Sequence, residues 1–211
     1  MRSVIGWDVG GAHLKAARAE NGRIVDAIQL ASPLRLGLDR LAQAFAEAKV
    51  RIGVADLHAV TMTGELADTF SSRAEGVEQL SALAVRELAP AKMALYAGRA
   101  GFIAPPDAPR HVEDIASANW FASAALAARV QRTALLVDIG STTTDLVPVV
   151  DGAVASRGYT DAERLAAGEL VYTGLVRSFV MAVAERAPFA GRWSLLINEN
   201  FATMEIGRAH V

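Results

Sequence analysis

Two stretches of the sequence place an aspartate two residues before a glycine, where one apolar, strand-like segment ends and another begins. They are "VIGWDVGGAHLKAARA", which contains Asp8, and "LLVDIGSTTTDLVPVV", which contains Asp138. A tight glycine turn lets backbone N–H groups converge on an anion, and an aspartate at a strand end can hold Mg²⁺ against phosphate oxygens. One such turn alone is common and can be purely structural. The pair predicts two phosphate-binding hairpins that together clamp a di- or triphosphate.

The two turns differ in the side chains that surround the glycines. Residues 141–144 give the second turn four consecutive hydroxyl groups, which are neutral hydrogen-bond donors. The first turn has Ala12 and Leu14 at comparable places, and Lys15 follows them. A lysine suits a ligand that is itself a diphosphate, because a point positive charge stabilises a departing pyrophosphate.

Strands and helices alternate around these turns, which predicts an α/β protein. Strand-like periods cover 3–9, 14–19 and 23–30, and Asn21-Gly22 is a strong hairpin signal. Amphipathic helices are expected over 38–50 and 76–90, an extended proline-rich connection over 102–110, and one long alanine-rich helix over 111–130. A strand meander then recurs over 132–139, 145–150 and 153–158. We expect a first lobe over 1–130 and the start of a second lobe over 131–204.

Composition excludes several classes of function. The net charge of −2 offers no basic field for nucleic acid or anionic lipid, and the absence of cysteine excludes disulfides and Cys-ligated metals. The four histidines have no zinc-ligand spacing. No signal peptide or membrane span is evident, so we expect a cytoplasmic protein whose partners are neither nucleic acid nor membrane.

The last seven residues, "EIGRAHV", fit the translation of a common sequencing adapter. We interpret 205–211 as a non-native tail and expect the natural chain to continue past Met204. On this interpretation the second lobe is incomplete, and the fragment has little activity by itself.

Several segments resemble a known family. "VDIGSTTTDLVPV" resembles the second phosphate loop of the hydantoinase/oxoprolinase branch of the actin, sugar-kinase and heat-shock ATPase superfamily. The segments "IGWDVGGAHLKAA", "YAGRAGFIAP", "IASANW", "GELVYTGLVR" and "NENFATM" are similar to hydantoinase-like proteins linked to tetrahydromethanopterin C1 transfer. Those proteins are similar in turn to enzymes that build the furan core of methanofuran or methylofuran. The resemblance implies a ribonuclease H-like, actin/hexokinase-type fold with two mixed-sheet lobes, each opened by a phosphate hairpin.

The resemblance also implies a reaction and roles for individual residues. The reaction would be a transferase step that joins an aminomethylfuran-methyl diphosphate to γ-glutamyltyramine and releases diphosphate. Mg²⁺ would be held by Asp8 and Asp138. The expected catalytic residues are Asp8, Lys15, Asp138 and, as general base, Glu169. The expected diphosphate-binding residues are Gly10, Gly11, Gly140, Ser141, Thr142 and Thr143. The expected substrate-binding residues, each with an equally plausible structural role, are Arg99, Asn119 and Arg164.

Two other functions stay open at this point. One is an ATP-dependent hydantoinase/oxoprolinase-type amidohydrolase, which the hydroxyl-poor first turn disfavours. The other is a non-enzymatic, nucleotide-dependent regulator. The sequence leaves ATP binding and homo-oligomer formation undecided, and it predicts a small-molecule diphosphate and a phenolic amine as partners.

Overall fold

A computed structural model describes residues 3–200 and 202–204 of the chain. The chain divides into two compact units, Met1–Ala122 and Ser123–Val211. The boundary lies within helix α4 (Asn119–Val130), whereas the sequence places the lobe boundary at the end of that helix. The predicted non-native tail at 205–211 lies outside the described residues.

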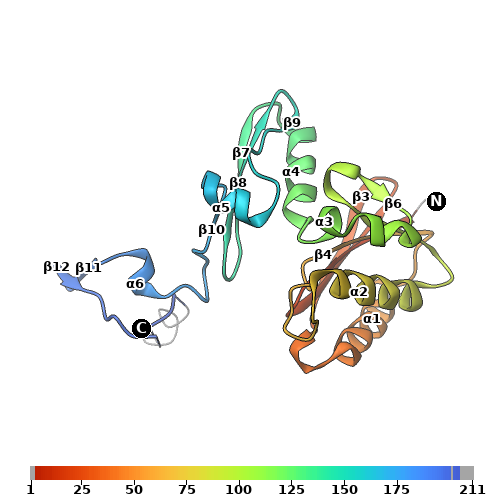
Figure 1. Ribbon diagram of the computed structural model, residues 1–211, viewed down its shortest axis with the longest axis horizontal. Coiled ribbons are helices and arrows are strands. Elements are labelled where there is room, and N and C mark those ends of the chain that lie inside the picture. The colour runs from red at the N-terminus through yellow and green to blue at the C-terminus, as the bar shows by residue number, and fades with distance from the viewer. Residues whose placement is uncertain (1–2, 201, 205–211) are drawn as a thin grey trace. The chain divides into compact units, whose positions relative to one another are not determined.

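The first unit is built on a six-stranded sheet in the order β3-β2-β1-β4-β5-β6 (Figure 1). Strands β1, β2 and β3 form an antiparallel meander, β4 and β5 run parallel to β1, and β6 is antiparallel. This α/β arrangement is the ribonuclease H-like order that the sequence predicts. The strands are β1 (Ser3–Val9), β2 (His13–Glu20), β3 (Arg23–Ala31), β4 (Leu57–Met62), β5 (Lys92–Tyr96) and β6 (Phe102–Ile103).

Turn chemistry and capping explain where these elements begin and end. Asn21 and Gly22 have φ of 51° and 80°, the left-handed pair that a tight two-residue hairpin requires. The helices of this unit are α1 (Leu38–Ile52), α2 (Arg73–Leu88) and α3 (Val112–Ile115), with 3₁₀ turns η1 (Leu34–Leu36), η2 (Gly98–Ala100) and η3 (Pro105–Arg110). Ser72 caps α2, because its side chain accepts the Glu75 N–H.

The sequence prediction was wrong in three places, one of them in the second unit, where the strand expected over 153–158 is limited to Ala153–Val154. The proline-rich segment is not simply extended, because Pro105–Arg110 forms a 3₁₀ turn. The single helix expected over 111–130 is broken between α3 and α4. Ser117 lies in the left-handed region with φ of 54°, which an uninterrupted helix cannot contain.

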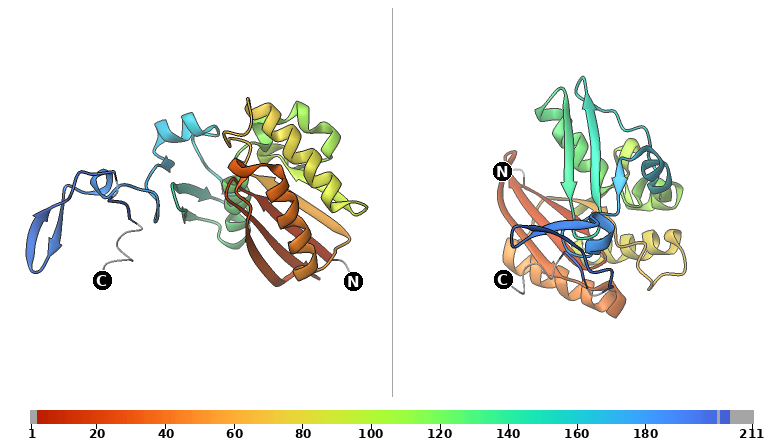
Figure 2. Two further views of the ribbon diagram at one scale, coloured as in Figure 1. Left: turned by 90° about the horizontal axis from the view of Figure 1, so that it is seen from below. Right: turned by 90° about the vertical axis from the view of Figure 1, so that its left-hand side faces the viewer.

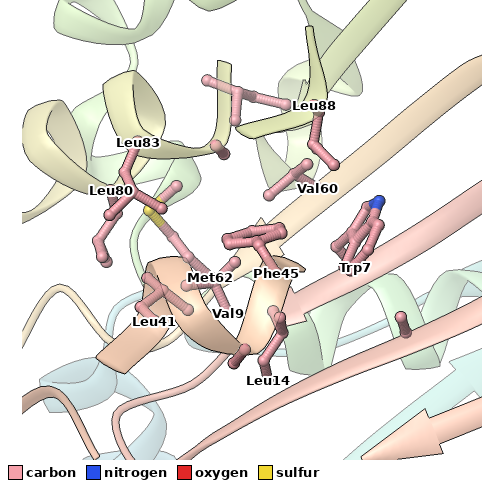
Figure 3. Packing of buried hydrophobic residues seen from close by; sticks show 14 of the residues in the cluster. Trp7, Val9, Leu14, Leu41, Phe45, Val60, Met62, Leu80, Leu83 and Leu88 are labelled. Atoms are coloured by element: carbon pink, nitrogen blue, oxygen red, sulfur yellow. The ribbon is translucent and has the colours of Figure 1, made fainter. Parts of the chain in front are cut away.

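Helices α1 and α2 lie side by side on one face of the sheet, as Figure 2 also shows. Ile5, Trp7 and Val9 alternate along β1 toward these helices and are buried. Figure 3 shows the Phe45 ring of α1 beside Trp7, and the two ring centroids are 5.0 Å apart. Trp7 is further fixed because its Nε1–H donates to His58 Nδ1 at 3.0 Å. The core therefore fixes β1, the strand that carries Asp8.

After the remainder of α4, the second unit continues with a long antiparallel hairpin of β7 (Ala134–Ile139) and β8 (Thr144–Val150) (Figure 1). Short β9 (Ala153–Val154) and β10 (Leu170–Val171) both pair with β8. Helix α5 (Asp161–Ala167) has a full capping box at Thr160. The remaining elements are α6 (Val180–Val183), β11 (Arg186–Phe189) and β12 (Arg192–Leu195), of which the strands form a separate hairpin.

Within the described residues, no helix is both long and apolar enough to span a bilayer.

We expect Phe45→Ala to destabilise the first unit by about 3–5 kcal/mol, because the change leaves a cavity against Trp7 in a fully buried site. Urea unfolding followed by tryptophan fluorescence measures this loss. Val50→Ala is the matched control on the same helix, since Val50 is 86% exposed and should change little. Equal losses for the two variants would contradict the packing described.

Candidate functional site

The two predicted hairpins have the same turn geometry. In the first, the Gly10 N–H donates to the His13 carbonyl at 3.0 Å; in the second, the Gly140 N–H donates to the Thr143 carbonyl at 2.8 Å. A Cβ at position 10 would lie 2.9 Å from the His13 oxygen, closer than real side chains come, so this turn requires glycine. The corresponding distance at position 140 is 3.3 Å, which is also tight.

This closure leaves amides of both turns free to bind an anion. Within the part of the chain that the structure describes, the N–H groups of Gly11 and Ala12 in the first turn have no hydrogen-bond acceptor. The same holds for the three N–H groups of residues 141–143 in the second turn, where the Ser141 and Thr142 hydroxyls lie 3.5 Å apart. Successive free N–H groups form the kind of nest that binds phosphate.

Asp8 and Lys15 come together beside the first turn. They are cross-strand neighbours in β1 and β2, and Lys15 Nζ lies 3.1 Å from Asp8 Oδ2. The side chains are 55% exposed for Lys15 and 22% exposed for Asp8, so the pair itself adds little stability. Asp8 Oδ1 is buried and has no partner among the described residues. Oγ1 of Thr61, the neighbour of Asp8 on β4, is likewise buried without a partner there.

The parallel strands bring further residues to the same edge of the sheet. Strands β1, β4 and β5 all end there, and the segment after β4 supports the turn because the N–H groups of Thr63 and Gly64 donate to the Val9 carbonyl. Arg99, in η2, follows β5 at this edge and is exposed. Asn119 is half-buried at the start of α4. Arg99 and Asn119 thus belong to segments outside the turn itself.

Glu65 is a buried carboxyl at this edge. It is 1% exposed, its Oε1 accepts the Ser117 hydroxyl at 2.9 Å, and its Oε2 has no partner among the described residues. Burial raises the pKa of Glu65, while the Ser117 hydrogen bond and the charge of Arg73 oppose that rise. The only sequence signal for this group is its place directly after the "TMTG" turn.

The charges beside the second turn are arranged differently. Asp138 is exposed and faces Asp145 across β7 and β8, at the register position where the first hairpin has Lys15. Burial raises the pKa of Asp145, the nearby Asp138 adds to this rise, and Arg164 opposes it. Arg164 Nη2 lies 2.7 Å from Asp145 Oδ1, and Arg164 is 1% exposed. This burial favours a positioning role for Arg164 over the substrate contact that the sequence suggests.

The carboxylate of Glu169 is saturated with donors. It accepts hydrogen bonds from the Ser156 hydroxyl at 2.5 Å and from the N–H groups of Arg157 and Gly158 at 2.7 and 3.0 Å. Burial raises the pKa of Glu169, but the three hydrogen bonds outweigh it and leave the pKa below its ordinary value. Such a carboxylate is a weak proton acceptor, so this geometry does not favour a general base.

Oxygen ligands suited to Mg²⁺ are present, but they are few. The unpartnered Asp8 Oδ1 fits a hard cation, and Asp138 offers an exposed carboxylate. No cluster of three or more His, Cys, Asp or Glu side chains that could hold a metal occurs among the described residues. A divalent cation at either hairpin would therefore need phosphate and water oxygens to complete its coordination.

The raised pKa of Glu65 gives a testable pH dependence. The folded protein binds the carboxyl proton of Glu65 more tightly than the unfolded chain does. Protonated Glu65 therefore stabilises the fold fully below the ordinary pKa of 4.5, and this contribution is lost as pH rises through the folded pKa. Glu65→Gln should therefore gain stability relative to wild type between about pH 4 and about pH 7. Urea unfolding at both pH values measures the difference, with exposed Glu78→Gln as control. Parallel pH curves for wild type and Glu65→Gln would show the prediction to be wrong.

Replacement of Glu169 separates structural support from proton transfer. Glu169→Gln places an amide NH₂ against three hydrogen-bond donors, so we expect a loss of roughly 1–3 kcal/mol in the free energy of unfolding. Urea unfolding followed by circular dichroism tests this, with exposed Glu185→Gln in the same unit as control. If the free energy of unfolding were unchanged, Glu169 would have no structural role, and the prediction that it is the general base would stand.

Comparisons with known proteins agree with the resemblance seen in the sequence. Residues 56–187, more than half of the chain, match the family described as hydantoinase/oxoprolinase. The chain is 30% identical over 200 residues to the (4-{4-[2-(gamma-L-glutamylamino)ethyl]phenoxymethyl}furan-2-yl)methanamine synthase of Methanocaldococcus jannaschii, which covers 94% of this chain and 59% of the synthase. It is 40% identical over 73 residues to the synthase of the same name from Methanococcus vannielii, covering 35% of this chain and 32% of that protein.

A solved structure of a Ppx/GppA family member from Aquifex aeolicus is similar at 16% identity and a TM-score of 0.44, covering 82% of this chain and 52% of that one. The chain thus spans somewhat over half the length of the M. jannaschii synthase that it matches along nearly its whole extent. On the match over residues 56–187, the chain belongs to the hydantoinase/oxoprolinase family.

Proposed function

We propose that each hairpin can bind phosphate groups of an alkyl diphosphate substrate, in a transferase that forms an aryl ether during furan-cofactor biosynthesis. The observation that carries the proposal is the shared turn closure, which leaves two adjacent N–H groups free in one hairpin and three in the other. The M. jannaschii synthase supports the product class, because the name of its product contains a phenoxymethyl-furan ether.

The proposed reaction needs stabilisation of a leaving group more than it needs a protein nucleophile. The phenol oxygen of γ-glutamyltyramine forms a bond to the furylmethyl carbon, and the bond from that carbon to the diphosphate oxygen breaks. The electron pair of the broken bond leaves with the diphosphate, and the phenol proton passes to a base. Donors that are already oriented toward the departing oxygens lower the barrier to this step.

In this proposal, different residues of the hairpins bind the phosphates and supply the positive charge. Gly10, Gly140 and the glycine at position 11 allow close approach of the phosphates, and the free amides with the hydroxyls of 141–143 donate to them. Lys15 supplies the positive charge for the developing pyrophosphate. In the structure Lys15 already pairs with Asp8, so a bound diphosphate must share or replace that partner.

Mg²⁺ fits the proposal through Asp8 and Asp138. When bound, it would neutralise charge on the diphosphate oxygens. The unpartnered Asp8 Oδ1 is the protein atom best placed for it in the first hairpin. Arg99 stays a proposed partner of the glutamyl carboxylate, and Asn119 a proposed substrate contact, because both lie in segments near the same sheet edge as Asp8.

For a chain that carries the continuation expected past Met204, we expect ether formation and pyrophosphate release from the furylmethyl diphosphate and γ-glutamyltyramine without ATP consumption. Lys15→Ala should reduce the rate by about 100-fold or more, since it removes one preorganised contact to the leaving group. Pyrophosphate release, ether product by mass spectrometry and ATP turnover are measured in parallel. Lys92→Ala is the control, because Lys92 is exposed on β5 of the same sheet and belongs to neither hairpin.

The M. jannaschii synthase serves as the positive control for the substrates. ATP hydrolysis without ether product would overturn the transferase and favour an ATP-dependent hydantoinase-type activity. A Lys15→Ala variant with the wild-type rate would remove Lys15 from the mechanism even if ether forms.

A further inference from the structure

Residues 173–178, which we call the strap, pass directly beside the second turn. Strand β10 is antiparallel to β8, and Val171 pairs with Thr144 at the point where β8 leaves the turn. The chain that follows β10 therefore continues past residues 140–143. The sequence of the strap is "TGLVRS".

Three consecutive backbone amides attach the strap to the turn. The Leu175 N–H donates to the Gly140 carbonyl at 3.0 Å, and the N–H groups of Val176 and Arg177 donate to the Ser141 carbonyl at 3.1 and 2.8 Å. The Thr144 hydroxyl donates to the Thr173 carbonyl at 2.5 Å. These bonds use turn carbonyls and leave the amides of 141–143 free.

Gly174 explains how the strap approaches so closely. A Cβ at this position would lie 2.6 Å from both Ser141 C and Thr142 N, which are backbone atoms that cannot move aside easily. Gly174 is buried, and its N–H donates to the Ser178 hydroxyl at 2.6 Å. The strap is thus held against the turn by contacts on both sides of the glycine.

This attachment fixes the backbone of Arg177 one hydrogen bond away from Ser141. The Arg177 side chain is exposed, and the described residues offer it no ion pair or hydrogen bond. Around the same turn, Asp138 and Asp145 are carboxylates, and the guanidinium of Arg164 is buried against Asp145. A diphosphate bound to the free amides would therefore lie near the carboxylates of Asp138 and Asp145. The buried guanidinium of Arg164 would not be accessible to balance its charge.

We propose that Arg177 is an anion-binding residue of the second hairpin and contacts the diphosphate held by the amides of 141–143. Its planar guanidinium can donate two parallel hydrogen bonds to one phosphate group. The inference rests on the proposed function, since it assumes that this hairpin binds a diphosphate. It adds a cation that sequence reasoning did not select and gives the strap a role in ligand binding.

Titration calorimetry of the full chain with inorganic pyrophosphate, with and without Mg²⁺, tests the inference. Arg177→Gln should weaken the Kd by about tenfold or more, the scale of one charged hydrogen bond to an anion. Arg177→Lys should fall between wild type and Arg177→Gln, because it keeps the charge and loses the planar fork. The matched control is Arg132→Gln, since Arg132 is also exposed in the same unit and pairs with Asp151 at the far end of β7 and β8.

The outcomes separate the inference from the proposed function. Pyrophosphate binding that Arg177→Gln leaves unchanged overturns the role of Arg177 and leaves the hairpin as a diphosphate site. Equal weakening by Arg132→Gln also overturns it, because the effect would then be one of overall charge. A wild-type chain that binds no pyrophosphate overturns the proposed diphosphate site and the inference together. Urea unfolding of Arg177→Gln, expected to match wild type for an exposed side chain, shows that the loss is not one of folding.

Discussion

A single backbone hydrogen bond, from a glycine N–H to the carbonyl three residues later, closes each of the two hairpin turns. The rest of each site follows from this closure. The glycine N–H is used inside the turn, and the N–H groups that come directly after it have no acceptor among the described residues. A side chain at position 10 would collide with the His13 carbonyl oxygen that accepts this hydrogen bond, so the position requires glycine. The free amides are thereby already in place before any ligand is present, as the proposed anion site requires.

The same backbone carries opposite charge in the two hairpins. Across from Asp8 the first hairpin has Lys15, which is accessible, and across from Asp138 the second has Asp145, which a buried arginine neutralises. The first hairpin therefore offers an exposed cation and few hydroxyls, while the second offers hydroxyls and a buried charge network. Each hairpin thus presents a different electrostatic environment to a bound anion.

Features carried by local pattern could be predicted from the sequence. The hairpins of β1–β2 and β7–β8 follow from strand alternation and glycine turns, and so do the buried face of β1 and the Asn21-Gly22 turn. Features that depend on distant partners could not be. The helix break at Ser117 involves a hydroxyl bond to Glu65, and the apolar pattern of 111–130 runs through it without a signal. The sequence suggested a substrate contact for Arg164 and a general base for Glu169. It did not reveal that Arg164 pairs with Asp145, or that the carboxylate of Glu169 accepts hydrogen bonds from the amides of 157 and 158.

The strap holds the second turn through main-chain atoms, and this has a consequence for how the protein can diverge. Leu175, Val176 and Arg177 each contribute an N–H group, which every amino acid except proline possesses. Their side chains are thus free to vary without loosening the turn, whereas Gly174 is constrained by the backbone it touches. The fold separates the backbone atoms that hold the turn from the side chains that could tune the proposed anion site. A single codon change can therefore alter a side chain beside this proposed site while the hairpin stays intact.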